Sequence, residues 1–388
     1  MNKERNSPMK EIYLDHAATT PIAAEVANEM ITVYQEVFGN PSSVHSYGRK
    51  ARKMLDEARR LAASSINANE KEIYFTSGGT EADNIALIGT ALANRDKGNH
   101  IITTAQEHHA VLHTAEYLES IGFDVTYLSV SETGRISLDE LEKALREDTI
   151  LVSIMYVNNE TGVIQPIEEI GSILKEHQAY FHTDAVQAYG LLEIDVNALQ
   201  VDLLTTSAHK INGPKGVGFL YAHESVPVQN LSFGGEQERK RRAGTENVAA
   251  IVGFSKAIEL VKLEREERNK QYQLYKELFV QQLREEDIEF TLNGEQENTI
   301  SAIVNISFPG TNVEQVLTNL DLSGIAASSG SACTAGSVEP SHVLSAMFGE
   351  NNPCTTNSIR FSFGSANTKE NVIEAAKRIA KIIRRLTN

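Results

Sequence analysis

Short runs of β-branched and aromatic residues alternate with helical patterns between residues 72 and 223. Small polar residues separate them, and the runs begin at Glu72, His100, Asp124, Ile150, Ala179, Asp202 and Val217. This alternation is typical of an α/β domain. We therefore predict a large α/β domain with a mainly parallel seven-stranded sheet, whose functional groups gather at the carboxyl ends of the strands.

A different pattern follows from Ile258 to Arg284, where apolar residues recur mostly at three- and four-residue steps among many charges. This spacing predicts one long connecting helix. Beyond it we expect a strand at 301–308, a helix at 313–320, a strand from 359 and a last helix capped by Thr368. The predicted organisation is an N-terminal segment (1–20) that joins the small domain, a large domain (21–260) and a small α+β domain (261–388).

The composition is that of an ordinary globular protein. Of its 388 residues, 41% are hydrophobic and 23% are charged, which argues against disordered and fibrous classes. The net charge of -16 disfavours non-specific binding to nucleic acid or anionic lipid. The first ten residues lack the apolar run of a secretory signal or membrane anchor. We therefore expect a cytoplasmic protein with no direct nucleic-acid or membrane partner.

The chain contains two cysteines, Cys333 and Cys354. Two thiols are too few for a disulfide framework or for a cysteine-based metal site, so no metal is expected. Cys333 lies in a run of small residues from Ala326 to Ser337, which is typical of a loop. Cys354 matches no functional motif, and we expect a small buried hydrophobe there.

Lys210 ends an apolar strand just before the Gly/Pro turn of SAHKINGPKG. A lysine in a cleft can lose its proton and attack an aldehyde, although a lone lysine beside a turn is usually a surface residue. Two other features accompany it. Gly79 and Thr80 lie in a strand-to-helix turn that suits an anion, and Asp184 ends the preceding strand, where it can cap a helix or pair with a ring nitrogen. An aldehyde cofactor with a phosphate and a pyridine ring requires these three groups.

Nine motifs occur in order along the chain. They are YLDHAATTP, NPSSVH, TSGGTEADN, EHHAVL, VNNETG, HTDAVQ, SAHKINGPKG, RAGTEN and SSGSACTAGSVEPSHVL. Together they resemble the NifS/IscS-type cysteine desulfurases, class V aminotransferase relatives with the fold type I architecture of pyridoxal-phosphate enzymes. The resemblance runs from Tyr13 to beyond Arg360. It implies pyridoxal 5'-phosphate as the cofactor and L-cysteine as the substrate.

The resemblance also implies roles for individual residues. Lys210 would form the Schiff base, Cys333 would take the sulfur, and His108, rather than the adjacent His109, would stack on the cofactor ring and move protons. The implied cofactor-binding residues are Lys210, Gly79, Thr80, His108, Asn159, Asp184, Gln187, Ser207, His209 and Thr245. Asp184 would pair with the ring nitrogen and Gln187 would donate to the ring hydroxyl, whereas Gly79, Thr80, Ser207 and His209 would hold the phosphate.

The same resemblance implies which residues bind the substrate and how the subunits assemble. Asn159 and Arg360 would bind the substrate, and the planar guanidinium suits a clamp on its carboxylate. In this family a threonine from the neighbouring subunit completes the phosphate site, so Thr245 implies a homodimer. His45 also lies in a family motif, and we expect a structural role for it.

Cys333 decides which reaction the cofactor would support. A thiolate beside the substrate sulfur can take that sulfur as a persulfide and leave alanine, an exchange between thiol-type centres that serine cannot perform. The persulfide would pass to acceptor proteins. An iron–sulfur scaffold, a tRNA-thiolation enzyme, a thiamine-pathway protein, or several of them, all fit the sequence.

Three other classes of protein fit the sequence less well. Another pyridoxal-phosphate enzyme of the same fold, such as a class V aminotransferase or a selenocysteine lyase, would not need Cys333 and its long loop. An inactive scaffold subunit would not need Lys210, Asp184 and Cys333 to be intact. A dinucleotide-binding oxidoreductase would need a G-x-G-x-x-G turn after its first strand, which the chain lacks.

Overall fold

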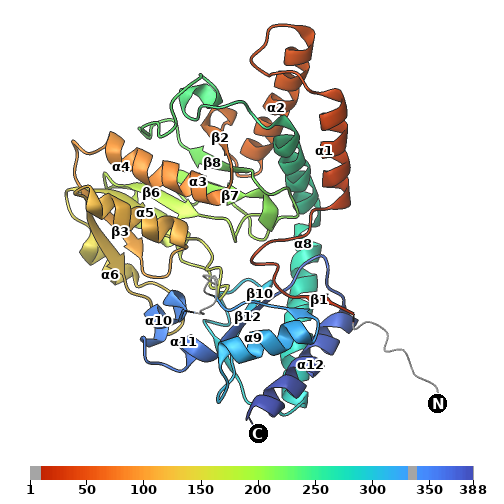
Figure 1. Ribbon diagram of the computed structural model, residues 1–388. Helices are drawn as coiled ribbons and strands as arrows, with labels where there is room; N and C mark the ends of the chain where they lie inside the picture. Colours follow the sequence, from red (N-terminus) through yellow and green to blue (C-terminus); the bar gives the residue numbers. More distant parts are fainter. Residues whose placement is uncertain (1–9, 331–338, 388) are drawn as a thin grey trace.

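The computed structural model describes residues 10–330 and 339–387, and its larger part is built on a seven-stranded sheet (Figure 1). The strands are β2 (Ile73–Thr76), β3 (His100–Thr104), β4 (Asp124–Leu128), β5 (Thr149–Ser153), β6 (Tyr180–Asp184), β7 (Leu203–Ser207) and β8 (Gly218–Ala222). Their order is β2-β8-β7-β6-β5-β3-β4. The strands from β7 to β4 run parallel, whereas β8 pairs antiparallel with both β7 and β2. The predicted α/β class and the seven strands are confirmed.

Helices cover both faces of this sheet, so its strands are buried on both sides. In β3, Ile101 packs into one apolar cluster and Ile102 into another, as the alternation of side chains along a strand requires. The helical segments of this part are α1 (Ala24–Glu36), α2 (Ser46–Ser64), η1 (Glu70–Glu72), α3 (Gly79–Asn84), η2 (Ile85–Gly89), α4 (Thr90–Ala93), α5 (His109–Ser120), α6 (Leu138–Ala144), α7 (Ile167–Leu174), η3 (Ala208–Lys210) and η4 (Glu238–Lys240).

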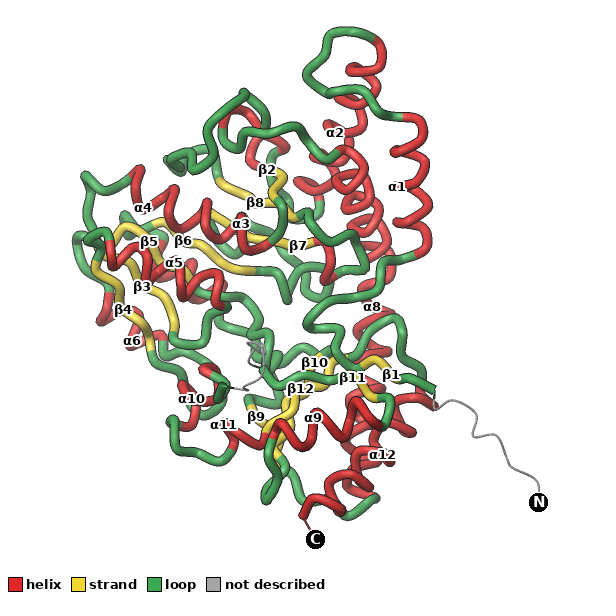
Figure 2. The backbone as a smooth tube through the Cα atoms, in the orientation of Figure 1, coloured by secondary structure: helices red, strands yellow, loops and turns green. Residues whose placement is uncertain are grey.

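The long helix α8 (Val248–Glu285) connects the two parts of the molecule (Figure 2). It begins at Val248 rather than near Ile258, where the pattern predicted its start. Every residue from Val248 to Phe254 is buried, so the first turns have no polar face and carry no amphipathic period. The predicted domain boundary between residues 260 and 261 falls inside this unbroken helix and stays a prediction.

The smaller part holds two short sheets and the C-terminal helices. Its elements are β9 (Thr291–Asn293), β10 (Ile303–Ser307), α9 (Val313–Leu322), β11 (Ile325–Ala326), α10 (His342–Phe348), α11 (Cys354–Asn357), β12 (Ser358–Ser362) and α12 (Lys369–Thr387). The order of the antiparallel sheet is β12-β10-β9, and β1 (Ile12–Tyr13) pairs with β11. The N-terminal strand thus packs on the small part. Thr368 accepts the backbone N–H of Asn371 at 3.2 Å, as the predicted cap requires.

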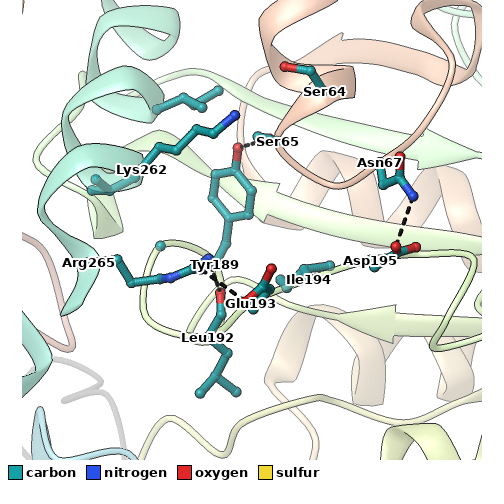
Figure 3. A pocket seen from close by; sticks show the side chains of 13 residues that line it. Ser64, Ser65, Asn67, Tyr189, Leu192, Glu193, Ile194, Asp195, Lys262 and Arg265 are labelled. Carbon is teal, nitrogen blue, oxygen red and sulfur yellow. Dashed lines mark hydrogen bonds and ion pairs between the residues drawn. The ribbon is translucent and has the colours of Figure 1, made fainter.

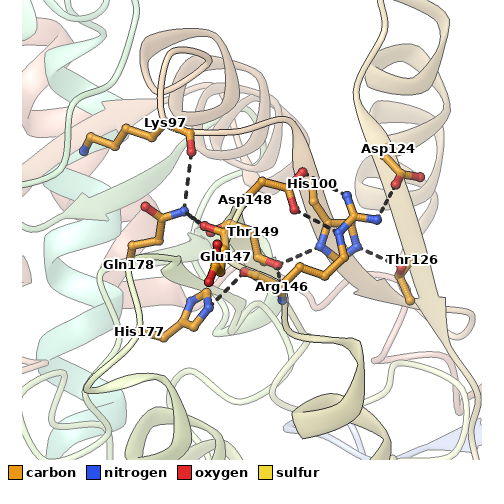
Figure 4. Close-up of polar contacts among 10 residues, drawn as sticks. All are labelled: Lys97, His100, Asp124, Thr126, Arg146, Glu147, Asp148, Thr149, His177 and Gln178. Carbon is orange, nitrogen blue, oxygen red and sulfur yellow. Dashed lines mark hydrogen bonds and ion pairs between the residues drawn. The ribbon is translucent and has the colours of Figure 1, made fainter.

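The amino ends of three parallel strands are joined by polar side chains (Figure 4). His100 opens β3 and is buried, with its ring nitrogens 2.7 Å from Oγ1 of Thr149 and 2.8 Å from Oγ1 of Thr126. Nearby, Arg146 pairs with Asp124 at 2.5 Å. These contacts bind β3, β4 and β5 to one another at this edge of the sheet, and the functional groups lie at the opposite edge.

Large apolar side chains are exposed on α1 and on the turn that follows it. Phe38 is 74% exposed and Val44 is 89% exposed, while the rings of Phe38 and Tyr47 lie 5.2 Å apart. Such a patch usually marks a contact with another molecule. Within the described ranges, none of the helices has the length and apolar composition of a membrane span.

Candidate active site

A cavity of about 510 Å³ lies at the carboxyl ends of the central strands. Asp184 ends β6 and Ser207 ends β7, and both side chains line it. Ten of the residues predicted from the sequence are among those that line this cavity. They are Gly79, Thr80, His108, Asn159, Asp184, Gln187, Ser207, His209, Lys210 and Arg360. The fold therefore brings residues from both parts of the molecule to one place.

Two predicted site residues are not among them. Cys333 lies outside the described residues, although Gly330, which precedes the undescribed segment, lines the cavity. Thr245 is exposed and does not line the cavity of its own chain. The roles of Cys333 and Thr245 therefore stay predictions.

His45 and Cys354 were expected to have no part in the chemistry, and the structure shows the local contacts of each. His45 caps α2, because its Nδ1 accepts the backbone N–H of Gly48 at 3.2 Å. Cys354 opens α11 and is half-buried. The prediction that it is a buried hydrophobe is therefore corrected, since only part of the side chain is removed from water.

Lys210 lines the cavity, and its ε-amino group is held by backbone carbonyl groups. It donates to the carbonyl oxygens of Ala17 and, at 3.0 Å, Ala18. Desolvation and the charge of Arg360 lower the pKa of Lys210 to about 8, although Asp184 opposes the shift. A lysine with this pKa yields a neutral, nucleophilic amine near neutral pH far more readily than a surface lysine.

The two carboxylate oxygens of Asp184 have different surroundings. Oδ1 accepts the backbone N–H of Val186 at 2.8 Å, while Oδ2 accepts no hydrogen bond from the described part of the chain. Burial raises the pKa of Asp184 to about 6, and the Val186 N–H and the charge of Lys210 oppose that shift. The turn-capping role and the predicted pairing with a ring nitrogen can therefore coexist, because each uses its own oxygen.

His108 caps the start of α5 at the cavity wall. Its Nδ1 accepts the backbone N–H of Ala110 at 3.1 Å, so the neutral ring carries its proton on Nε2. Burial lowers the pKa of His108 to about 4, and the charge of Lys210 acts in the same direction. His109 also lines the cavity, with its ring 4.6 Å from that of His342.

Arg360 comes from β12 in the small part and is 5% exposed. Its Nη1 donates to the carbonyl oxygen of Asn159 at 3.0 Å, and its Nη2 lies 2.9 Å from Oδ1 of Asp15. Among the described residues, Nε has no hydrogen-bond partner. The guanidinium is thus fixed in the cavity wall, and a substrate carboxylate would compete with Asp15 for Nη2.

A helical run from Gly79 to Ala93 begins at the cavity with two glycines. Gly78 has a φ of 148°, a conformation that favours glycine. A Cβ on Gly79 would lie 2.9 Å from Cγ2 of Val186, so a larger residue would crowd this turn. Its backbone N–H groups suit an anion such as a phosphate.

These groups fit a cofactor that has an aldehyde, a ring nitrogen and a phosphate. The cavity offers a lysine of lowered pKa, a carboxylate with one available oxygen and the amino end of a helix. Together the fold and the site define an α/β enzyme that carries its catalytic groups at the carboxyl ends of parallel strands.

Comparisons with known proteins place the chain more narrowly. The family model described as "Aminotransferase class-V" matches residues 12–374. A Bacillus subtilis (strain 168) protein, provisionally named cysteine desulfurase IscS 1, is 59% identical over 98% of this chain and 100% of its own length. The cysteine desulfurase IscS of Methanosarcina thermophila is 50% identical over 98% of this chain and 93% of its own length.

Solved structures of similar proteins support the same family. A NifS-like protein superposes with a TM-score of 0.91 at 36% identity, covering 97% of this chain and 100% of its own. SspA in complex with cysteine gives a TM-score of 0.82 at 37% identity, covering 91% of this chain and 99% of its own. The chain belongs to the class-V aminotransferase family, and within it to the IscS/NifS-type cysteine desulfurases.

Several polar residues of the site were missed from the sequence. Asp83, Glu160 and His342 line the cavity, and the carbonyl oxygen of Glu107 accepts from Nε2 of His342 at 2.9 Å. Each lies inside one of the nine motifs, but acidic residues are rarely buried, so their burial was not anticipated. The sequence did offer one indication of these residues, because they lie beside residues already predicted for the site, as Glu107 lies beside His108.

A second hollow of about 310 Å³ lies between the end of α2 and the middle of α8 (Figure 3). The hydroxyl of Tyr189 lies 2.5 Å from Oγ of Ser65, and Lys262 and Arg265 of α8 form the other wall. None of the site residues predicted from the sequence lines it. The larger cavity is therefore the candidate active site.

Proposed function

We propose that this protein is a pyridoxal-phosphate-dependent cysteine desulfurase, which converts L-cysteine to L-alanine and keeps the sulfur as a persulfide on Cys333. The observation that carries the proposal is the shared cavity of Lys210, Asp184 and Arg360, with Gly330, the last described residue before the Cys333 segment, in its wall. The names of the IscS relatives and of the cysteine complex support the same reaction.

The residues of the cavity divide the work of this reaction. Lys210 would attach the cofactor, Gly79 and Thr80 would hold its phosphate, and Asp184 would keep its ring nitrogen protonated. When bound, the cofactor supplies a sink for the electrons released at the substrate Cα. Ser207 and His209 would complete the phosphate site, Asn159 and Gln187 would lie at the ring hydroxyl, Arg360 would orient the substrate carboxylate, and Nε2 of His108 would exchange protons with the substrate.

Sulfur transfer itself needs no external oxidant. The thiolate of Cys333 forms a bond to the substrate sulfur while the substrate C–S bond breaks, and that electron pair stays with Cβ, which a proton then converts to the methyl group of alanine. The substrate sulfur is oxidised to the sulfane level and the carbon is reduced by the same two electrons. The chemistry requires a thiol, because serine cannot exchange sulfur in this way.

The two cysteines provide a matched test. Cys333→Ser, loaded with pyridoxal phosphate, should remain yellow and bind cysteine, but it should form neither alanine nor protein persulfide. Cys354→Ser should retain both products, because its half-buried thiol does not line the cavity. Alanine production by Cys333→Ser at the parent rate would refute the proposal and favour an aminotransferase or a lyase.

We also infer a homodimer with shared active sites. Val37, next to the exposed Phe38, packs in one cluster with Val248 at the start of α8, and Thr245 precedes that helix by three residues. The residue beside the exposed Phe38 and the helix start beside Thr245 thus belong to one apolar cluster, which supports a subunit contact that delivers Thr245 to a partner. Co-refolded Thr245→Ala and Lys210→Ala chains should regain activity that neither variant has alone. No recovery would show that the sites are not shared.

The persulfide would pass to acceptor proteins in the cytoplasm. An iron–sulfur scaffold, a tRNA-thiolation enzyme and a thiamine-pathway protein are the acceptors that fit this class of reaction. Transfer of label from ³⁵S-cysteine through Cys333 to a purified acceptor should distinguish them. Label that reaches an acceptor equally well from Cys333→Ser would contradict a persulfide route.

A further inference from the structure

Glu160 places a buried carboxyl group in the cavity wall. It lies in the turn after β5 and is 0% exposed. Its Oε2 accepts a hydrogen bond from the hydroxyl of Ser341 at 2.5 Å, while its Oε1 is buried without a partner among the described residues. A buried carboxyl with one oxygen that lacks a hydrogen-bond partner costs stability, so its presence calls for an explanation.

The same carboxyl touches the chain on both sides of residues 331–338. On one side lies Gly330, where an added Cβ would come within 1.6 Å of Oε2 of Glu160. On the other lies Ser341, whose Oγ also accepts the backbone N–H of Leu344 at 3.1 Å and so caps α10. Glu160 is therefore in direct contact with the residues that lead into and out of the segment holding Cys333.

The base that carries Glu160 is itself rigid. Oδ1 of Asn158 accepts the backbone N–H groups of Glu160 and Thr161 at 2.9 and 3.0 Å. Asn305 of β10 donates to the carbonyl oxygen of Glu160 at 3.3 Å, and Arg360 holds the adjacent Asn159. A side chain on so constrained a turn can hold the residues that it contacts in a defined place.

We propose that Glu160 is a positioning residue for the reaction proposed above, because its buried carboxyl holds Ser341 by a hydrogen bond and packs against Gly330 in the wall that also holds Arg360. The inference rests on the proposed function, and it assigns Glu160 no proton transfer. Burial raises the pKa of Glu160, against the opposing effects of Ser341, Arg360 and His109. Anchoring needs a hydrogen-bond acceptor of the right shape, which a glutamine amide also provides.

The test compares Glu160→Ala with Glu160→Gln, using Glu169→Ala of the exposed face of α7 as the matched control. The first readout is the rate of iodoacetamide alkylation at Cys333, measured by mass spectrometry, with Cys354 as the internal reference. Glu160→Ala should alkylate Cys333 at least about threefold faster than the parent, because its anchors are released, while Cys354 reacts at the parent rate. Glu160→Gln and Glu169→Ala should match the parent.

Kinetics supply the second readout. In Glu160→Ala, kcat for alanine formation should fall by about ten- to a hundredfold, as expected for a displaced reacting group, with KM for cysteine within about twofold. Glu160→Gln should keep kcat within about threefold. Ser341→Ala removes the other partner and should reproduce the loss, and the double variant should be no worse than Glu160→Ala.

The outcomes separate the two proposals. A parent enzyme that forms no alanine or persulfide would refute the proposed function, and the alkylation rates would still test the anchorage. Parent-like alkylation and kcat in Glu160→Ala would refute the anchorage alone. Equal loss in Glu160→Gln and Glu160→Ala would show that the ionisable carboxyl is needed and would also overturn it. If Glu160→Ala does not fold, Ser341→Ala and Glu160→Gln decide between the same outcomes.

Discussion

A buried ion pair fastens the loop before α8 to the edge of the large sheet. Both terminal nitrogens of Arg59, in α2, lie 2.7 Å from the carboxylate of Glu238. The two side chains are only 6% and 2% exposed. Oε2 of Glu238 also accepts the backbone N–H of Phe75 at 2.9 Å. Glu238 opens a stretch of three residues with positive φ that continues through Lys240, so the pair holds the loop in a conformation that side chains disfavour.

Removal of one partner should be far more costly than removal of both. Glu238→Ala leaves the charge of Arg59 buried and unpaired, which costs about 3–5 kcal/mol in the free energy of unfolding. Arg59→Met combined with Glu238→Met removes both charges and should recover part of that loss, because the Phe75 N–H still lacks its acceptor. The exposed pair of Lys53 and Glu57, 3.8 Å apart at 76% and 52% exposure, is the control, and Glu57→Ala should cost less than about 1 kcal/mol.

Urea unfolding followed by circular dichroism, at one protein concentration, measures these differences. The free energy of unfolding should fall in the order parent, double variant, Glu238→Ala. The same order should hold for activity, because the loop continues to Thr245, which we assign to the neighbouring active site. A loss below about 1 kcal/mol in Glu238→Ala would show that water reaches Arg59, and the argument from burial would fail.

Three further predictions concern the site and the sheet. The parent loaded with pyridoxal phosphate should be yellow, borohydride should bleach it and add mass to the peptide with Lys210, and Lys210→Ala should lack the colour. Arg360→Ala should raise KM for cysteine and lower kcat/KM by roughly two to four powers of ten, whereas an unchanged KM would place the carboxylate clamp elsewhere. Burial lowers the pKa of His100, so the protein should lose stability as the pH falls below about 6.5, where the unfolded histidine takes up a proton that the folded one resists. The urea midpoint should depend less on pH in His100→Gln, and equal slopes would show that His100 does not titrate on unfolding.

The sequence predicted the large sheet well, because parallel strands covered on both faces appear as uninterrupted β-branched and aromatic runs. All seven strands lie where those runs predicted them. The strands of two or three residues, β1, β9 and β11, were missed, because so few residues show no period. The start of α8 was missed for the opposite reason, since its first turns are apolar on every side.

The site residues could be predicted from the sequence where a motif lies at the end of a predicted strand. Lys210 and Asp184 follow adjacent parallel strands, so the topology alone brings them to one edge of the sheet. Glu160 and Asp83 were not predictable in this way, because their burial results from packing between segments that are distant in sequence. The tie between Arg360 and Asp15 also joins residues at opposite ends of the chain, and no local pattern indicates it.

The buried charges at the cavity bear on the proposed role of Asp184 as the partner of a ring nitrogen. Asp83, Glu107 and Asp184 are all buried, and repulsion disfavours more than one negative charge among them. Burial raises the pKa of Glu107 to about 8, and burial together with the charge of Asp184 raises the pKa of Asp83 well above its usual value. Asp184, with a pKa of about 6, is favoured as the ionised member by the N–H of Val186 and by Lys210. Burial and mutual repulsion therefore favour protons on Asp83 and Glu107, and the negative charge of this trio is favoured on Asp184.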